Sequence, residues 1–182
     1  MAEVDAAVSA TWLTRALSQR VPGIVVTART IDRVLIGCSV KVFVSVSCND
    51  FGRAAGLPER LVVKAGFGRH GAFMEFTYLA EMLSYREVLP VLGIQSPRCF
   101  YAGPSPYGDS VALILEDLGA RQVRFCHALE PLDIAQAAAF VRALARFHAG
   151  SWDIGSRPAL LAAWRHDAAR IRQSYADYFA AL

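Results

Sequence analysis

Lys64 ends a strand that is otherwise apolar, Leu61-Val62-Val63. An unpaired buried ammonium group is costly, so this lysine needs a partner. Glu81 is the natural candidate, because it lies in the following predicted helix with Tyr85 one turn later on the same face. A strand lysine held by a helix carboxylate is how kinases place a cation against the α- and β-phosphates of ATP. The alternative is a solvated strand-end lysine and an unrelated surface glutamate, and the pair alone does not decide between the two.

A second candidate segment is Leu113-Ile114-Leu115-Glu116-Asp117-Leu118-Gly119, an apolar strand that ends in two acids. It lies where a β-rich part of the chain meets an α-rich part. In a two-lobed kinase this is the place of the hinge, whose backbone C=O and N–H groups recognise adenine while its polar side chains face outward. The alternative is a strand that ends at a solvated turn.

The elements that must position these residues follow from composition and hydrophobic period. Residues 24–63 are rich in Val, Ile and Thr, which favour strands, whereas residues 128–182 are rich in Ala, which favours helices. We predict strands over residues 31–36, 40–46, 60–65, 99–102 and 111–116, and helices over residues 10–20, 72–88 and 131–149. The fold class is therefore α+β, with one helix inserted after the third of five strands and further helices at the end.

Five short motifs follow one another in a specific order. They are Val62-Val63-Lys64, Glu81-x-x-x-Tyr85-Arg86, Pro97-Arg98-Cys99-Phe100-Tyr101, Ile114-Leu115-Glu116-Asp117-Leu118 and Leu144-Ala145-Arg146-Phe147-His148-Ala149. Together they resemble the aminoglycoside phosphotransferase and choline-kinase-like superfamily of small-molecule kinases, and most closely its ecdysteroid-kinase-like branch. The resemblance covers residues 10–155, most of the chain.

The resemblance implies roles for residues on the nucleotide side. Lys64 matches the lysine that binds the phosphates of ATP, and Glu81 matches its ion-pair partner. Gly37-Cys38-Ser39, which we call the covering loop, matches the loop over the nucleotide between the first two strands. This loop has one glycine where protein kinases have several, which leaves its phosphate contacts open.

The resemblance also implies an architecture. Residues 1–118 form a protein-kinase-like N-terminal lobe with a five-stranded antiparallel sheet, and residues 120–182 form part of a helical C-terminal lobe, in which His148 is a core histidine. The hinge lies near residues 116–119. The main-chain atoms of Glu116 and Leu118 match those that hold adenine, and Leu115 matches the position at the back of the adenine pocket.

The catalytic half of the family's site has no counterpart in this sequence. The family uses an H-G-D-x-x-x-x-N loop and a later Asp to accept the hydroxyl proton and hold Mg²⁺. Because neither occurs here, we assign no catalytic residue and no metal ligand. Complete relatives are expected to move the γ-phosphate of ATP to a hydroxyl of an unidentified small molecule, whereas this chain is expected to be a fragment or inactive. The alternative is a non-catalytic module that binds a nucleotide or a partner.

Residues 66–71 have the pattern Gly-x-Gly-x-x-Gly, after a strand and before a helix. This is the pattern of a dinucleotide-binding turn, so an oxidoreductase is a third, more distant alternative. That fold needs a second parallel strand ending in Asp or Glu, and the next strand here ends without an acid. We therefore interpret residues 66–71 as a flexible connection.

Composition excludes several other classes. The net charge of +3 is weak and no basic run concentrates it, which argues against a nucleic-acid partner. No stretch of apolar residues is long enough to span a membrane. The four cysteines form no C-x-x-C pair, so we expect free thiols in a reducing cytoplasm.

The end of the sequence has an apolar stripe at helical spacing. Its members are Leu161, Trp164, Ala168, Ile171, Tyr175, Tyr178 and Leu182. This spacing predicts an amphipathic helix whose stripe needs a cover. We expect the chain to self-associate through residues 160–182 if no further part of the fold covers them.

Overall fold

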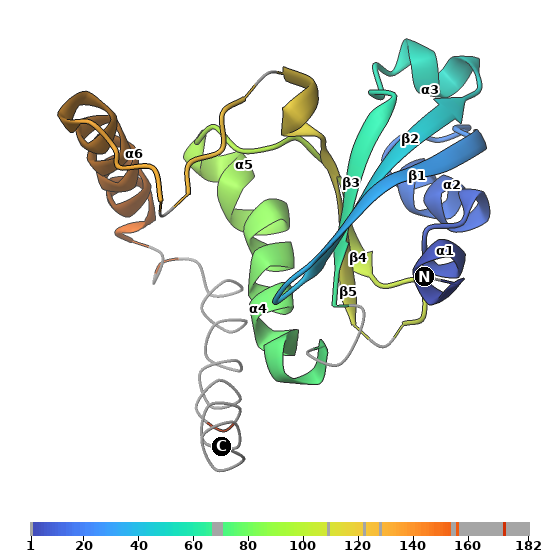
Figure 1. Cartoon of the computed structure of the whole chain (residues 1–182), viewed down its shortest axis with the longest axis horizontal. Coiled ribbons are helices and arrows are strands. Elements are labelled where there is room, and N and C mark those ends of the chain that lie inside the picture. Colours follow the sequence, from blue (N-terminus) through green and yellow to red (C-terminus); the bar gives the residue numbers. More distant parts are fainter. Residues whose placement is uncertain are drawn as a thin grey trace.

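The computed structural model of the chain describes residues 2–66, 71–108, 110–121, 123–127, 129–153, 156 and 173, with the backbone alone at residues 2–3 and 71–76. Within these residues the central element is a five-stranded sheet of order β1-β2-β3-β5-β4 (Figure 1). The strands are β1 (Val26–Ile36), β2 (Val40–Cys48), β3 (Arg60–Ala65), β4 (Cys99–Pro104) and β5 (Val111–Glu116). Every pairing is antiparallel, which confirms the predicted sheet. The described strands therefore offer no parallel β-α-β unit for a dinucleotide, and the oxidoreductase alternative loses its basis.

The helices include the three predicted over residues 10–20, 72–88 and 131–149, with different ends, and several short ones that were not predicted. The described helices are α1 (Ala2–Ala7), α2 (Ala10–Ser18), α3 (Asp50–Ala54), α4 (Gly71–Leu83), the π-helix η1 (Ser84–Val88), α5 (Leu89–Leu92), the 3₁₀-helix η2 (Leu118–Arg121) and α6 (Ile134–Ser151). The predicted helix over residues 72–88 is thus α4 followed by a wider π turn. Helix α6 begins later than Pro131 because Asp133 and Gln136 form a capping box.

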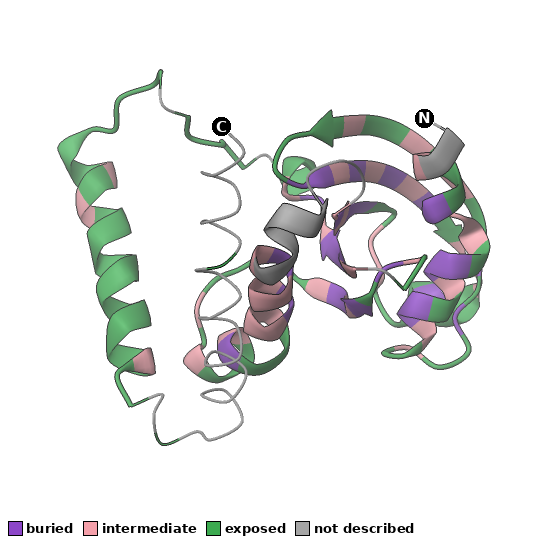
Figure 2. Ribbon diagram, turned by 90° about the horizontal axis from the view of Figure 1, so that it is seen from below, coloured by how far each residue is buried: buried purple, intermediate pink, exposed green. Residues whose placement is uncertain are grey.

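One face of the sheet packs on α2. Alternate residues of β2 are buried there, Val42 and Val44 completely, against Leu13 and Leu17 of α2 (Figure 2). Trp12 meets Tyr101 of β4 edge to face, with ring centroids 5.8 Å apart. This layer is the main core, and it leaves the opposite face of the sheet to α4.

The opposite face holds a smaller apolar cluster. Met82 of α4 packs there with Leu113 and Leu115 of β5. Helix α6 lies beyond α4 and α5, away from the sheet (Figure 1). Its His148 is exposed, so the prediction of a core histidine is wrong within the described residues. The ring of His148 instead meets Phe147 at its edge.

Two predictions fall largely outside the described residues. These are the connection at residues 67–70 and the tail helix with its apolar stripe, of which only Gln173 is described. Self-association through residues 160–182 therefore remains a prediction. Within the described part of the chain, no helix is both long and apolar enough to cross a membrane. All four cysteines are free, as predicted.

Candidate nucleotide site

Lys64 and Glu81 form the predicted ion pair. The Lys64 Nζ atom lies 2.6 Å from both carboxylate oxygens of Glu81. The two side chains are 22% and 26% exposed, so they are largely withdrawn from water yet reachable by a ligand. The alternative of a solvated lysine and an unrelated glutamate is therefore wrong.

Lys41 lies directly beside Lys64, and the sequence analysis missed it. The β2–β3 register sets the two lysines opposite each other, on the same face of the sheet. They are the only two lysines in a chain that is otherwise rich in arginine. Among the described residues no carboxylate forms an ion pair with Lys41, whereas Lys64 is paired with Glu81. The period of 2 in β2 and the rarity of lysine could have singled it out.

An apolar surface adjoins the two lysines. Val62 is two positions before Lys64 on β3 and therefore lies on the same face of the sheet. In the sheet register it is opposite Phe43 of β2 on one side and Leu115 of β5 on the other. Val62 and Leu115 are 9% and 8% exposed. The guanidinium of Arg33 covers the outer side of this surface, 4.0 Å from the centroid of the Phe43 ring. A flat apolar group and an anionic group attached to it would therefore both find matching surfaces on one face of the sheet.

The covering loop is tied to the helix that carries Glu81. The hydroxyl of Tyr78, one turn before Glu81 on α4, donates a hydrogen bond to the backbone carbonyl of Cys38. Burial is the main cause that raises the pKa of Tyr78, which keeps the phenol protonated and able to donate. Ser39 is buried, whereas Cys38 is exposed. The sequence analysis missed Tyr78, since its contact spans chain segments that only the folded structure brings together.

The glycine that the local packing requires is Gly66 and not Gly37. A Cβ atom on Gly37 would have the Ser39 carbonyl oxygen at 3.8 Å as its nearest neighbour, which is ordinary contact. A Cβ atom on Gly66 would lie 2.5 Å from the Tyr78 ring. Gly66 therefore lets Tyr78 approach the end of β3 and reach the covering loop.

At the predicted hinge, two acidic side chains are oriented differently from the prediction. Glu116 and Asp117 were expected to face outward, yet their side chains are only 10% and 4% exposed. Asp117 pairs with Arg60 at 2.6 Å and accepts the Gly119 N–H at 2.9 Å. These carboxylates fold back because they satisfy backbone N–H groups and arginines at the point where the sheet ends.

Glu116 and the hinge backbone complete this arrangement. A Glu116 carboxylate oxygen accepts the Arg98 N–H at 2.9 Å and pairs with Arg121 at 3.2 Å. The backbone N–H of Glu116 donates to the Arg98 carbonyl, and that of Asp117 donates to the Arg60 carbonyl. The backbone N–H of Leu118 is a donor that has no acceptor among the described residues.

Comparison with protein families matches residues 58–178 to the ecdysteroid kinase-like family. The match includes Lys64, Glu81 and the hinge. The chain belongs to the ecdysteroid kinase-like family. The covering loop, Lys41 and Phe43 lie before the matched region, so their place in the site rests on the structure. No curated protein and no solved structure matches the chain.

The ecdysteroid kinase-like chain offers no metal centre in its described residues. No group of three or more His, Cys, Asp and Glu side chains is placed there to hold an ion. Kinases hold Mg²⁺ with acidic and amide side chains together with the phosphates of ATP, and we assign none of the described residues as a ligand of that ion.

Asp117 should stabilise this part of the fold. Replacing it by Ala removes a buried carboxylate from Arg60 and from the Gly119 N–H, so we expect a loss of about 1–2 kcal/mol in the free energy of unfolding. The matched control is Asp50→Ala, whose partner Arg53 and own side chain are both exposed, with an expected change within about 0.5 kcal/mol. Denaturant unfolding measures both. Equal effects of the two substitutions would contradict the role assigned to Asp117.

Proposed function

We propose that the sheet face bearing Lys41 and Lys64 binds ATP, as the nucleotide half of a small-molecule phosphotransferase. The observation that carries this proposal is the Lys64–Glu81 ion pair, 2.6 Å long and beside an apolar surface. Glu81 holds the Lys64 ammonium in place without enclosing it, so the free side of the ammonium is available to phosphate oxygens.

Adenine and the phosphates of ATP would bind at different positions along the strands. Adenine fits the surface of Val62, Leu115 and Phe43, within reach of the hinge backbone at Glu116 and Leu118. The phosphates fit two residues further along the strands, where Lys41 and Lys64 lie side by side. Two adjacent ammonium groups repel each other in the empty site. A polyanion relieves this repulsion, which favours a di- or triphosphate over a nucleoside.

The covering loop would close the site from the β1–β2 side. Gly37 and Ser39 flank the exposed Cys38, and Tyr78 holds the Cys38 carbonyl. The same helix therefore positions both the loop, through Tyr78, and the phosphate-binding lysine, through Glu81. The ordered loop would limit the access of water to the phosphates.

Transfer itself needs groups that the described residues do not supply. When the terminal phosphoryl group passes to a hydroxyl oxygen, the bond to ADP breaks and the hydroxyl proton must go to a base. The sequence has no H-G-D-x-x-x-x-N loop to provide that base. We therefore expect purified 1–182 to bind ATP without turnover. This feature also favours the second candidate, a non-catalytic nucleotide-binding module.

Release of ADP tests the expectation that the chain binds ATP without turnover. Purified 1–182 incubated with ATP and Mg²⁺ should release no ADP above a protein-free control. Steady ADP release that is lost in Lys64→Ala would show that this chain supplies the missing groups, and would contradict the expectation of an inactive nucleotide half.

Binding at the proposed position is tested by alkylation of Cys38. ATP at about ten times its Kd should slow the reaction of Cys38 with iodoacetamide by about tenfold, because the bound fraction is protected. Cys126 is the matched control, since it is also exposed and lies outside the site. Burial raises the pKa of Cys99 to about 11 and raises that of Cys48, so these thiols react slowly in any case. Equal rates at Cys38 with and without saturating ATP would overturn the proposed position.

A further inference from the structure

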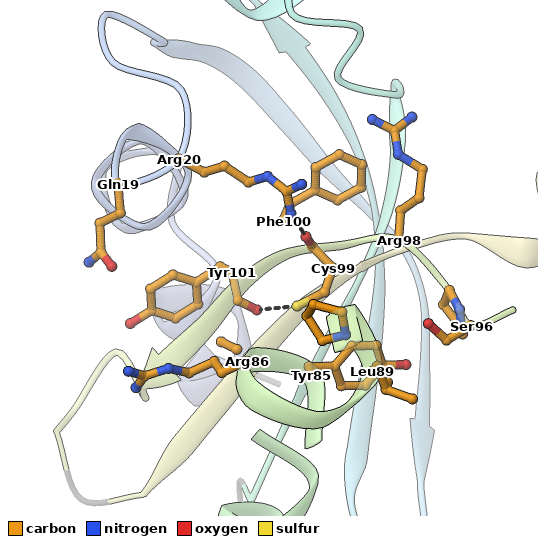
Figure 3. A pocket seen from close by; sticks show the side chains of 13 residues that line it. Gln19, Arg20, Tyr85, Arg86, Leu89, Ser96, Arg98, Cys99, Phe100 and Tyr101 are labelled. Carbon is orange, nitrogen blue, oxygen red and sulfur yellow. Dashed lines mark hydrogen bonds between the residues drawn. The ribbon is translucent and has the colours of Figure 1, made fainter. Parts of the chain in front are cut away.

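A second recess lies at the β4 edge of the sheet, outside the proposed nucleotide site. This edge pocket has a volume of about 520 Å³ and lies between the end of α2, the η1–α5 segment and the chain entering β4 (Figure 3). The volume is in the range of sites for small molecules. None of the residues assigned to ATP lines it.

The edge pocket is positively charged. Arg20, Arg86 and Arg98 line it, and none of the described lining residues is acidic. Figure 3 shows Arg20 above the pocket and Arg86 below it, with Cys99 and Tyr101 between them. Arg20 donates to the Cys99 carbonyl, which fixes its guanidinium at the pocket but uses few of its donors. Arg86 has only a long contact of 3.8 Å to Glu87, and both side chains are half exposed.

The remaining lining is aromatic and neutral. Tyr85, Phe100 and Tyr101 supply rings, and the Arg98 guanidinium lies 5.0 Å from the Phe100 centroid. Burial raises the pKa of Tyr85 to about 12 and that of Cys99 to about 11, so neither brings a negative charge at neutral pH. A ligand that matches these walls has a flat apolar body.

We propose that the edge pocket binds a small organic anion, a phosphate or carboxylate attached to a flat apolar body. The arginines that line the pocket, Arg20 and Arg86 among them, would attract the acid group, and the body would lie against Tyr85 and Tyr101. The ligand would contact η1, which directly continues the helix of Glu81. A π-helix is rare and frequently marks a functional position, which agrees with a ligand contact there.

The probes are phenyl phosphate, benzoate and the neutral benzyl alcohol, titrated into ¹⁵N-labelled 1–182. We expect saturable amide shifts at Tyr85, Arg86 and Cys99 with a phenyl phosphate Kd below about 10 mM. Binding of phenyl phosphate alone would identify a phosphate ligand, and binding of both anions would support the general anion site. If neither anion shows saturable binding, or if benzyl alcohol binds as tightly as the anions, the proposal is overturned.

Substitutions separate the edge pocket from charge attraction in general. Arg86→Gln and, independently, Arg20→Gln should each weaken phenyl phosphate binding about tenfold, as expected for loss of a charge-assisted hydrogen bond. Arg142→Gln removes the same charge from the exposed surface of α6 and should leave the Kd unchanged. Circular dichroism checks that each variant is folded. If Arg20→Gln does not fold, Arg86→Gln alone still tests the proposal. Equal affinities of Arg86→Gln, Arg142→Gln and the unsubstituted chain would contradict the site.

Discussion

Lys64→Met should weaken ATP binding by about ten- to hundredfold, the loss expected for charge-assisted hydrogen bonds worth about 1.5–3 kcal/mol. The substitution keeps the apolar stem of the side chain and removes only the ammonium group that Glu81 holds. Calorimetric titration of ATP measures the change. Arg142→Gln also removes one positive charge, from the exposed surface of α6, and should leave the affinity unchanged.

Glu81 should act on ATP only through Lys64. Glu81→Gln alone weakens ATP binding, because the ammonium group is no longer held by a charged partner. In the Lys64→Met background the same substitution should have no further effect. A double variant that binds ATP much more weakly than Lys64→Met would mean that Glu81 has a role of its own, and would contradict the proposed arrangement.

Gly66→Ala should be the most destabilising of the single glycine substitutions near the site. The added Cβ would lie 2.5 Å from the Tyr78 ring, which is 5% exposed and held at its hydroxyl by the Cys38 carbonyl. Crowding of this kind costs about 1–3 kcal/mol, so we expect a loss of about 2 kcal/mol and a Tm lower by about 4–8 °C.

A control variant and a double variant test whether the loss of stability comes from the contact with Tyr78. Gly37→Ala has room for its Cβ and should change stability by less than about 0.5 kcal/mol. Tyr78→Ala removes the ring that Gly66→Ala would meet, so the double variant should be less destabilised than the sum of the two single variants. Additive losses, or a Gly66→Ala protein as stable as Gly37→Ala, would show that the contact between Gly66 and Tyr78 does not constrain this region.

The sequence predicts the features that depend on local pattern. An apolar strand ending in lysine and a following helix with a glutamate make the Lys64–Glu81 pair one of two alternatives, and the resemblance carried by the five motifs favours the pair. The antiparallel sheet follows from the order of the elements and from the family resemblance. The family match over residues 58–178 supports the same interpretation.

The features that sequence reasoning missed depend on register and tertiary contact. Lys41 becomes a neighbour of Lys64 only once β2 and β3 pair in the observed register. Tyr78 reaches Cys38 across forty residues of chain, through space that Gly66 leaves open. Glu116 and Asp117 were expected to face outward because a hinge presents its backbone to adenine, whereas backbone N–H groups and arginines turn them inward.

The two lysines provide the most direct test of the proposed nucleotide site. Lysine is found at positions 41 and 64 only, so a chain labelled with ¹³C-lysine has two lysine spin systems, both on the proposed face. On titration with ATP, the ε-CH₂ signals of both lysines should shift and saturate with one Kd, equal to the Kd from calorimetry. ATP binding detected by calorimetry with both lysine signals unmoved, or no ATP binding at all, would contradict the proposal that this face of the sheet is the nucleotide site.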